Sequence, residues 1–275
     1  MRKSFLLACL LLATTTITAQ NIIIKGHVVN ERNSAVEYAT VGIPGTRYGT
    51  LTGIDGRFEF TLPQNCNDTL VVTHVSYGEA RIPPEAYMNT DSALVVTMQS
   101  HKLGEVVVYN GKRKSAKLQN KGMRIAGAVT SWNIDNIGNE VGSIIEVKHA
   151  FEIERIVFNT MSNNIESAKL SVNIYSINET EETFTNVIQH PVYIGIPTGD
   201  KKHGHTVLPK EKIFLEPGRY YISLKFVDGK GHNPKEERIL FPLYLKNGYV
   251  RNSAVDFPEK IPVNPGLQIV GFEYK

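Results

Sequence analysis

The chain has 275 residues, 41% of them hydrophobic, with 30 Lys and Arg residues against 27 Asp and Glu and a formal net charge of +3. This length accommodates two small domains. The positive surplus comes from the first residues and from one short central segment, so the composition excludes the basic folded face of a nucleic-acid-binding domain, and we expect no nucleic-acid partner.

The first 19 residues have the pattern of a secretory signal peptide. Arg2 and Lys3 form a basic start, residues 5–13 form an apolar run too short to span a bilayer, and Ala19 suits cleavage before Gln20. A buried core segment is the alternative interpretation, and Cys9 lies too near the start to mark lipidation. We therefore expect an exported chain without a transmembrane span in its mature part.

Residues 20–108 show the alternation of short β-strands. Phe58, Phe60 and Leu62 are apolar while the residues between them are polar, which places the three on one face. Asp55-Gly56 is a tight-turn dipeptide between two such strands. Glycine-rich turns recur at the spacing of a β-sandwich, and no helix of ordinary length is evident. The first domain is therefore predicted to be all-β.

A series of motifs covers nearly all of this first domain. The motifs are Gly26-x-Val28, Glu37-x-Ala39-x-Val41, Gly45-Thr46, Gly49-Thr50, Thr52, Asp55-Gly56-x-Phe58, Pro63, His74-Val75-x-Tyr77 and Leu103-x-Glu105-Val106-Val107-Val108. Together they resemble the carboxypeptidase-regulatory-like domain, a transthyretin-like (Ig-like) β-sandwich. The chain departs from that family at Ala35-Val36, where Pro-Leu is frequent, and at Ser76, where Gly is usual.

The resemblance implies a helper module without catalytic residues. In exported Bacteroides-type proteins this domain often precedes a TonB-dependent outer-membrane transporter. The resemblance thus implies a location in the periplasm, or at the outer membrane or cell surface, of a Gram-negative bacterium.

Residues 109–124 are predicted to form a linker. The segment combines glycine and serine with basic residues and few large apolar ones, which is the composition of a solvated, extended chain. Its basic residues are Lys112, Arg113, Lys114, Lys117, Lys121 and Arg124. A plain spacer is one interpretation. Contact with anionic lipid headgroups or lipopolysaccharide is the other, at roughly 1 kcal/mol per basic residue near the surface.

Residues 125–275 again show strand patterns. Leu170, Val172 and Ile174 alternate with polar residues, as in a strand with one buried face. Further strands are expected over residues 143–147, 153–158, 220–226, 241–245 and 267–272. These patterns predict a second, antiparallel, jelly-roll-like β-sandwich, which is only weakly similar to sandwich domains of exported Bacteroides-type proteins.

Four aromatic residues of this second domain are candidates for ligand binding. Trp132, the single tryptophan, could stack on a sugar ring or could fill the end of the sandwich. Tyr193, Tyr244 and Tyr249 are further candidates with the same two interpretations.

One pair of histidines has the spacing of a metal site. His203 and His205 are two residues apart, so on an extended strand both imidazoles point to the same side. Asp200 and His232 are the candidates to complete the site. A solvated polar loop is the alternative, since neighbouring lysines oppose metal binding.

No motif of an enzyme is present in the sequence. Metallopeptidase, nucleophile-elbow, phosphate-loop and dinucleotide patterns are all missing. We expect a non-enzymatic exported binding or assembly module of the cell envelope, linked to TonB-dependent nutrient uptake and without a cofactor. Its partner would be an outer-membrane transporter, another envelope protein or a glycan. The alternatives are a carbohydrate-binding protein with its site in the C-terminal sandwich, and a hydrolase with unrecognised residues.

Overall fold

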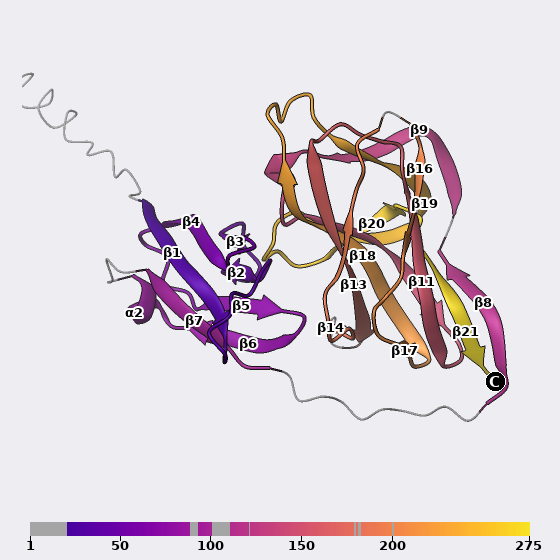
Figure 1. The fold of residues 1–275 in the computed structure, drawn as a ribbon, viewed down its shortest axis with the longest axis horizontal. Helices are drawn as coiled ribbons and strands as arrows, with labels where there is room; N and C mark the ends of the chain where they lie inside the picture. Colours follow the sequence, from indigo (N-terminus) through magenta and orange to yellow (C-terminus); the bar gives the residue numbers. More distant parts are fainter. Residues whose placement is uncertain are drawn as a thin grey trace, which may run out of the picture.

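The computed structural model describes residues 21–88, 93–100, 111–120, 122–178, 180, 183–199 and 201–275. In these residues the chain forms two β-sandwiches, which confirms the predicted all-β class (Figure 1). The described helices are α2 (Pro84–Tyr87) and the 3-10 helix η1 (Ile134–Asn136), and neither is long enough to cross a membrane. The predicted signal peptide lies outside the described residues.

The N-terminal sandwich consists of two small sheets. One has the order β4 (Arg57–Pro63), β1 (Asn21–Asn30), β7 (Leu94–Met98), and the other has the order β3 (Gly49–Leu51), β2 (Thr40–Gly42), β5 (Leu70–His74), β6 (Tyr77–Ile82). As the alternation predicted, Phe58, Phe60 and Leu62 of β4 are buried in the core between the sheets.

The C-terminal sandwich pairs a large sheet with a smaller one. The large sheet has the order β12 (Ser162–Asn163), β19 (Ile239–Arg251), β10 (Glu140–Val147), β18 (Gly218–Lys230), β13 (Ser167–Asn178), β14 (Thr183–Asn186). Strands β9 (Met123–Trp132) and β20 (Glu259–Asn264) also pair with β19, and β15 (Val192–Gly195) pairs with β13.

The smaller sheet has the order β16 (His203–Val207), β11 (Phe151–Thr160), β21 (Gln268–Tyr274), β8 (Arg113–Gln119), with β17 (Ile213–Leu215) also paired to β11. The chain passes from the large sheet at β10 to the smaller one at β11 and back to the large sheet at β12 and β13, a connectivity of the jelly-roll kind. Phe151, Phe158, Phe226 and Phe241 are fully buried between the two sheets.

Most of the predicted linker proves to be part of the second sandwich. Residues 113–119 form β8, which pairs along its whole length with β21. Ala116 and Leu118 of this strand pack against the core, while its basic residues are exposed. The predicted domain start at residue 125 is therefore too late. The pattern was missed because only two apolar side chains face inward among many charged ones. Residues 109, 110 and 121 lie outside the described residues.

The N-terminal sandwich packs against the outer face of the large sheet (Figure 1). The contact includes a small apolar cluster of Tyr38 and Leu51 from the first domain with Val227 and Ala254 from the second. The loop between β19 and β20 reaches the first domain, where the backbone N–H of Gly45 donates to the carbonyl oxygen of Val255 at 2.9 Å.

Glycines allow this loop to approach the first domain so closely. A Cβ atom at Gly42 would lie 2.8 Å from a methyl carbon of Val255, and one at Gly49 would lie 2.9 Å from the same side chain. Gly45 has a φ of 72° and would collide with the ring of Phe257 if it carried a Cβ. Two motifs of the N-terminal domain, Gly45-Thr46 and Gly49-Thr50, therefore lie at the domain interface.

Candidate functional site

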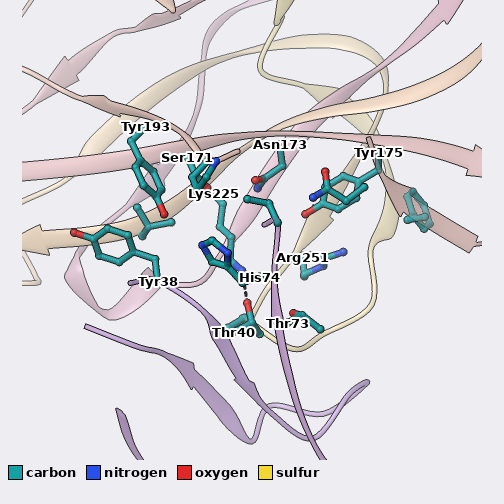
Figure 2. Close-up of a pocket in the computed structure, with 16 residues that line it drawn as sticks. Tyr38, Thr40, Thr73, His74, Ser171, Asn173, Tyr175, Tyr193, Lys225 and Arg251 are labelled. Atoms are coloured by element: carbon teal, nitrogen blue, oxygen red, sulfur yellow. Dashed lines mark hydrogen bonds between the residues drawn. The ribbon is translucent and has the colours of Figure 1, made fainter. Parts of the chain in front are cut away.

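A cleft lies between the two sandwiches and consists of two adjoining cavities. The smaller has a volume of about 290 Å³ and the larger of about 910 Å³. They share lining residues from both domains, namely Thr40, Thr73, Phe184, Arg251 and Ala254. Figure 2 shows the smaller cavity, with side chains of β2 and β5 facing those of β13, β18 and β19. The cleft therefore exists only where the two domains meet.

The floor of the cleft is a row of polar residues across four strands of the large sheet. In the strand register Lys225 lies opposite Ser171 on one side and Glu140 on the other, and Glu140 lies opposite Arg251. Alternate residues of a strand share one face. The inward neighbours of these residues, such as Leu224, fill the core, so the polar side chains are directed to the outer face.

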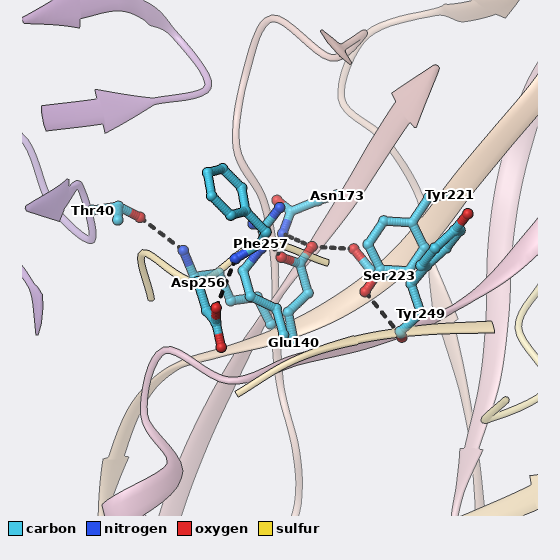
Figure 3. A network of polar contacts seen from close by, with 10 residues as sticks. Thr40, Glu140, Asn173, Tyr221, Ser223, Tyr249, Asp256 and Phe257 are labelled. Atoms are coloured by element: carbon cyan, nitrogen blue, oxygen red, sulfur yellow. Dashed lines mark hydrogen bonds and ion pairs between the residues drawn. The ribbon is translucent and has the colours of Figure 1, made fainter. Parts of the chain in front are cut away.

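Glu140 is a fully buried carboxylate whose two oxygens are both bonded (Figure 3). The side-chain amide of Asn173 donates to Oε1 at 3.1 Å, and the hydroxyl of Ser223 donates to the same oxygen. The guanidinium of Arg251 pairs with Oε2 at 2.8 Å. A buried charge bonded in this way joins the strands that supply its partners. Glu140 is therefore a structural group.

Lys225 is a buried residue of the same floor. Its ammonium donates to the hydroxyl of Thr40, at 2.8 Å, across the domain interface. Burial lowers the pKa of Lys225 to about 8; the charge of Arg251 acts in the same direction and that of Glu140 opposes it. The side chain is therefore mostly charged at neutral pH, although it is removed from water.

His74 supplies a neutral imidazole on the opposite wall. Burial lowers the pKa of His74 to about 4, and the charge of Lys225 adds to the effect. The backbone N–H of Ser76 donates to Nδ1 of the ring at 3.1 Å. Because Nδ1 accepts this bond, the proton of the neutral ring is on Nε2, which makes Nε2 a hydrogen-bond donor.

Aromatic rings form the rim of the cleft. The rings of Tyr38 and Tyr193 meet edge to face at 5.3 Å. The ammonium of Lys169 donates to the hydroxyl of Tyr38 at 2.9 Å, and this hydroxyl donates to Asp228 at 2.9 Å. At the other end of the cleft, Tyr249 lines the larger cavity.

The structure divides the four predicted aromatic ligand residues into two pairs. Tyr193 lines the smaller cavity and Tyr249 the larger, where its ring meets that of Phe184 at 5.0 Å. Trp132 is only 4% exposed, because it lies in the core between Phe226 and Phe241, at 6.2 and 4.9 Å.

Tyr244 is likewise only 7% exposed. The structure therefore corrects the ligand-binding prediction for Trp132 and Tyr244. Both are core residues, the other interpretation that the sequence left open.

The three predicted metal ligands that the structure describes do not form one cluster. His203 and His205 lie on β16 with ring centres 4.7 Å apart, but His205 is buried and its Nε2 bonds to the hydroxyl of Thr160 at 2.8 Å. His232 pairs with Glu166 at 2.9 Å. Within the described residues no group of three or more His, Cys, Asp and Glu side chains could hold a metal ion. Asp200 lies outside that part of the chain.

The basic residues of the predicted linker have varied surroundings. Arg113 pairs with Glu152 at 3.3 Å and its guanidinium lies 3.5 Å from the ring centre of Phe272. Arg124 donates to the sulfur of Met161 at 3.4 Å. The side chains of Lys112, Lys114 and Lys117 are exposed, while Lys121 is outside the described residues. Contact of these residues with an anionic surface stays a prediction.

Sequence reasoning missed the charged floor of the cleft. Glu140, Lys225 and Arg251 of this floor, and His74 of the opposite wall, were not among the predicted site residues. The available signal was the polar side of predicted strands, such as Tyr221, Ser223 and Lys225, but a strand with one buried face is commonly solvated on its other face.

Comparisons with known proteins identify the first domain. The family model of the CarboxypepD_reg-like domain matches residues 24–108. The TonB-dependent receptor SusC of Bacteroides thetaiotaomicron is 34% identical over 90 residues, which is 33% of this chain and 8% of SusC. The chain thus matches less than a tenth of that relative's length.

Two solved structures of infectious bursal disease virus are also similar to the chain. A T13 viral particle gives a TM-score of 0.28 at 11% identity, covering 93% of this chain and 73% of that one. The structure of the Gx strain gives a TM-score of 0.30 at 9% identity, covering 92% of this chain and 76% of that one. From the family match and the SusC segment, residues 24–108 of this chain are a CarboxypepD_reg-like domain.

Proposed function

We propose that this protein is a non-enzymatic, exported binding module of the cell envelope whose ligand lies in the cleft between its two sandwiches. The observation that carries the proposal is the larger cavity of about 910 Å³, lined by residues of both domains. Binding sites for small ligands are usually clefts of about 300–1,000 Å³ at such domain interfaces.

The groups in the cleft favour binding over catalysis. Glu140 is fully buried and is not among the residues that line either cavity, so its carboxylate is not placed to contact a ligand. A general base works best when its pKa is near the working pH, whereas burial lowers the pKa of His74 to about 4. Glu79, a further acid of the cleft, pairs with Arg81 at 2.7 Å.

A location in the cell envelope is supported by two features of the sequence. The first 19 residues have the pattern of an export signal, and the N-terminal domain is related to a segment of a TonB-dependent receptor. We propose that the protein assists TonB-dependent uptake, with a transporter or another envelope protein as its partner. Fractionation of the native host tests this location: processed chain in the envelope is expected, and unprocessed chain in the cytosol contradicts it.

The chemistry of the cleft favours a glycan as ligand. Tyr193 and Tyr249 offer aromatic surface, and Ser171, Asn173 and Asn186 offer hydroxyl and amide groups. Sugars are bound by such combinations of aromatic faces and polar groups. The N-terminal domain contributes one wall, so the site is shared between the domains and is not confined to the C-terminal sandwich.

Binding and turnover of a glycan library test this function directly. Purified protein from residue 20 onward should bind at least one glycan without shortening it. Tyr249→Ala should weaken that binding by roughly tenfold or more. Leu208→Ala is the matched control, because Leu208 is exposed and is not among the residues that line the cleft. Hydrolysis of any glycan by the protein, or equal binding by both variants, contradicts the proposal.

A further inference from the structure

The smaller cavity contains more positive than negative charge. Lys225 and Arg251 both line it, and Glu140, which faces both, is bonded to Arg251. At the rim the charges of Lys169 and Asp228 offset each other through the hydroxyl of Tyr38. The ammonium of Lys225 bonds to a neutral hydroxyl, which leaves its charge without a bonded anion.

A second observation concerns Arg251. Its Nη1 atom pairs with Glu140 at 2.8 Å, but its Nε atom is buried without a hydrogen-bond partner. Among the described residues this is the one buried side-chain nitrogen or oxygen atom that lacks a partner. A buried N–H without an acceptor is costly, and such groups call for a specific explanation. The bond to Glu140 thus leaves part of the donor capacity of this guanidinium unused, and Arg251 lines the cavity through its more accessible atoms.

We propose that the smaller cavity binds the carboxylate of an acidic sugar residue, held by the ammonium of Lys225 and the guanidinium of Arg251. This inference rests on the proposed function and names its class of ligand. Charge-assisted hydrogen bonds to a carboxylate are about twice as strong as neutral ones. A ligand carboxylate that accepts from Lys225 would also offset the cost of burying this ammonium, which has no bonded anion of its own.

The shape of the cleft suits a sugar chain with one acidic unit in the smaller cavity. The volume of about 290 Å³ is near the lower limit for small-ligand sites, and the wall there carries the polar side chains of Ser171, Asn173 and Asn186. The adjoining cavity of about 910 Å³ has the rings of Tyr249 and Phe257 for further units. Phe257 is 66% exposed, so its ring is available for stacking.

Calorimetric titration of the full mature chain with two matched trisaccharides tests the inference. The probes are α-1,4-linked trigalacturonate and neutral α-1,4-linked galactotriose. Trigalacturonate should bind roughly tenfold or more tightly than galactotriose. Lys225→Met should reduce this preference to about twofold or less, with a melting temperature no lower than that of the parent chain, because the uncharged side chain is easier to bury. Lys230→Met is the control, since Lys230 is exposed and pairs with Glu166 outside the cleft.

Each other outcome of the titration overturns a defined part of the account. Equal affinity for the two trisaccharides, or an acid preference that Lys225→Met retains, overturns the acidic ligand and leaves the proposed glycan function standing. If trigalacturonate does not bind but inorganic phosphate binds to the parent chain and not to Lys225→Met, the cavity is a phosphate site. The proposed sugar acid is then wrong. If neither trisaccharide binds but another glycan of the library does, only the inference fails. If no glycan binds, the proposed glycan function fails with it.

Discussion

At the scale of single residues, Glu140 on β10 connects its own strand to three others. Its carboxylate receives bonds from Asn173 on β13, Ser223 on β18 and Arg251 on β19. Removing one partner of a buried ion pair leaves the other charge buried without compensation, which costs far more than the loss of an exposed pair. The floor of the cleft is thus rigid because its charges are mutually bonded.

We expect Glu140→Ala to lower the free energy of unfolding by about 3–5 kcal/mol, as measured by urea denaturation. The matched control is Glu59→Ala, which removes an exposed carboxylate paired with Lys25 and should cost less than about 1 kcal/mol. A similar small loss in both variants would show that Glu140 is not the group that connects these strands.

The low pKa of His74 makes stability depend on pH. The pKa is about 4 in the folded chain because the ring is buried, against 6.5 for an ordinary histidine. Between these values the unfolded chain binds the proton and the folded chain does not, so stability falls as the pH drops from about 6.5 towards 4. His205, whose pKa is also lowered to about 4 by burial, acts in the same direction.

His74→Gln should therefore lose less stability than the parent chain when the pH is lowered from about 7 to about 5. Urea unfolding at the two pH values measures the difference. Leu208→Gln is the control, because Leu208 is exposed and has no titratable group, and this variant should behave like the parent chain. Identical pH dependence of His74→Gln and the parent chain would contradict the lowered pKa of His74.

At the scale of elements, alternation in the sequence predicted strands where one face is strongly apolar. Phe58, Phe60 and Leu62 face the first core, and Leu170, Val172 and Ile174 face the second. β8 was not predicted, because its inward face has only Ala116 and Leu118. The local pattern of apolar residues also contains no information about the distant partner strand β21. Pairing between distant strands decided the structure of this segment.

The segment from residue 111 should therefore be needed for a stable C-terminal sandwich. A fragment of residues 111–275 keeps β8 and all of β9, whereas a fragment of residues 125–275 loses β8 and the start of β9. We expect the longer fragment to melt cooperatively and at a clearly higher temperature than the shorter one. Equal melting temperatures in calorimetry would mean that β8 adds nothing to the fold.

The position of the loop between β19 and β20 against the first domain should depend on the glycines that the loop covers. A valine at Gly49 would collide with Val255, whereas a Cβ atom at Gly195 has nothing within 4 Å. Gly49→Val should accelerate hydrogen exchange in residues 252–258, and Gly195→Val should not. Unchanged exchange in both variants would show that this loop is not held against the first domain.

At the scale of the whole molecule, the sequence predicted two sandwiches but not their contact. The hydrogen bond between Thr40 and Lys225 joins residues 185 positions apart, and no local pattern connects them. The polar face of β18 is typical of a solvated strand, so its coverage by another domain could not be inferred. Tyr193 and Tyr249 were predicted as site residues because they are aromatic. The charged residues beside them were not predicted, because only the contact between the domains removes them from water.

The contact between the sandwiches is also what creates the cleft. Domains joined by a linker generally move relative to each other unless their interface holds them. Here the interface includes the apolar cluster around Tyr38 and the backbone bond from Gly45 to Val255. A ligand that touches both walls would strengthen this arrangement, because it would bind the docked form alone.

Small-angle X-ray scattering of the mature chain measures this arrangement in solution. The docked pair of domains predicts a scattering curve that fits the single structure of Figure 1 over its described residues, at low and at high salt. A curve that fits only a mixture of separated domain positions, with a larger radius of gyration, would contradict the shared cleft on which the binding function depends.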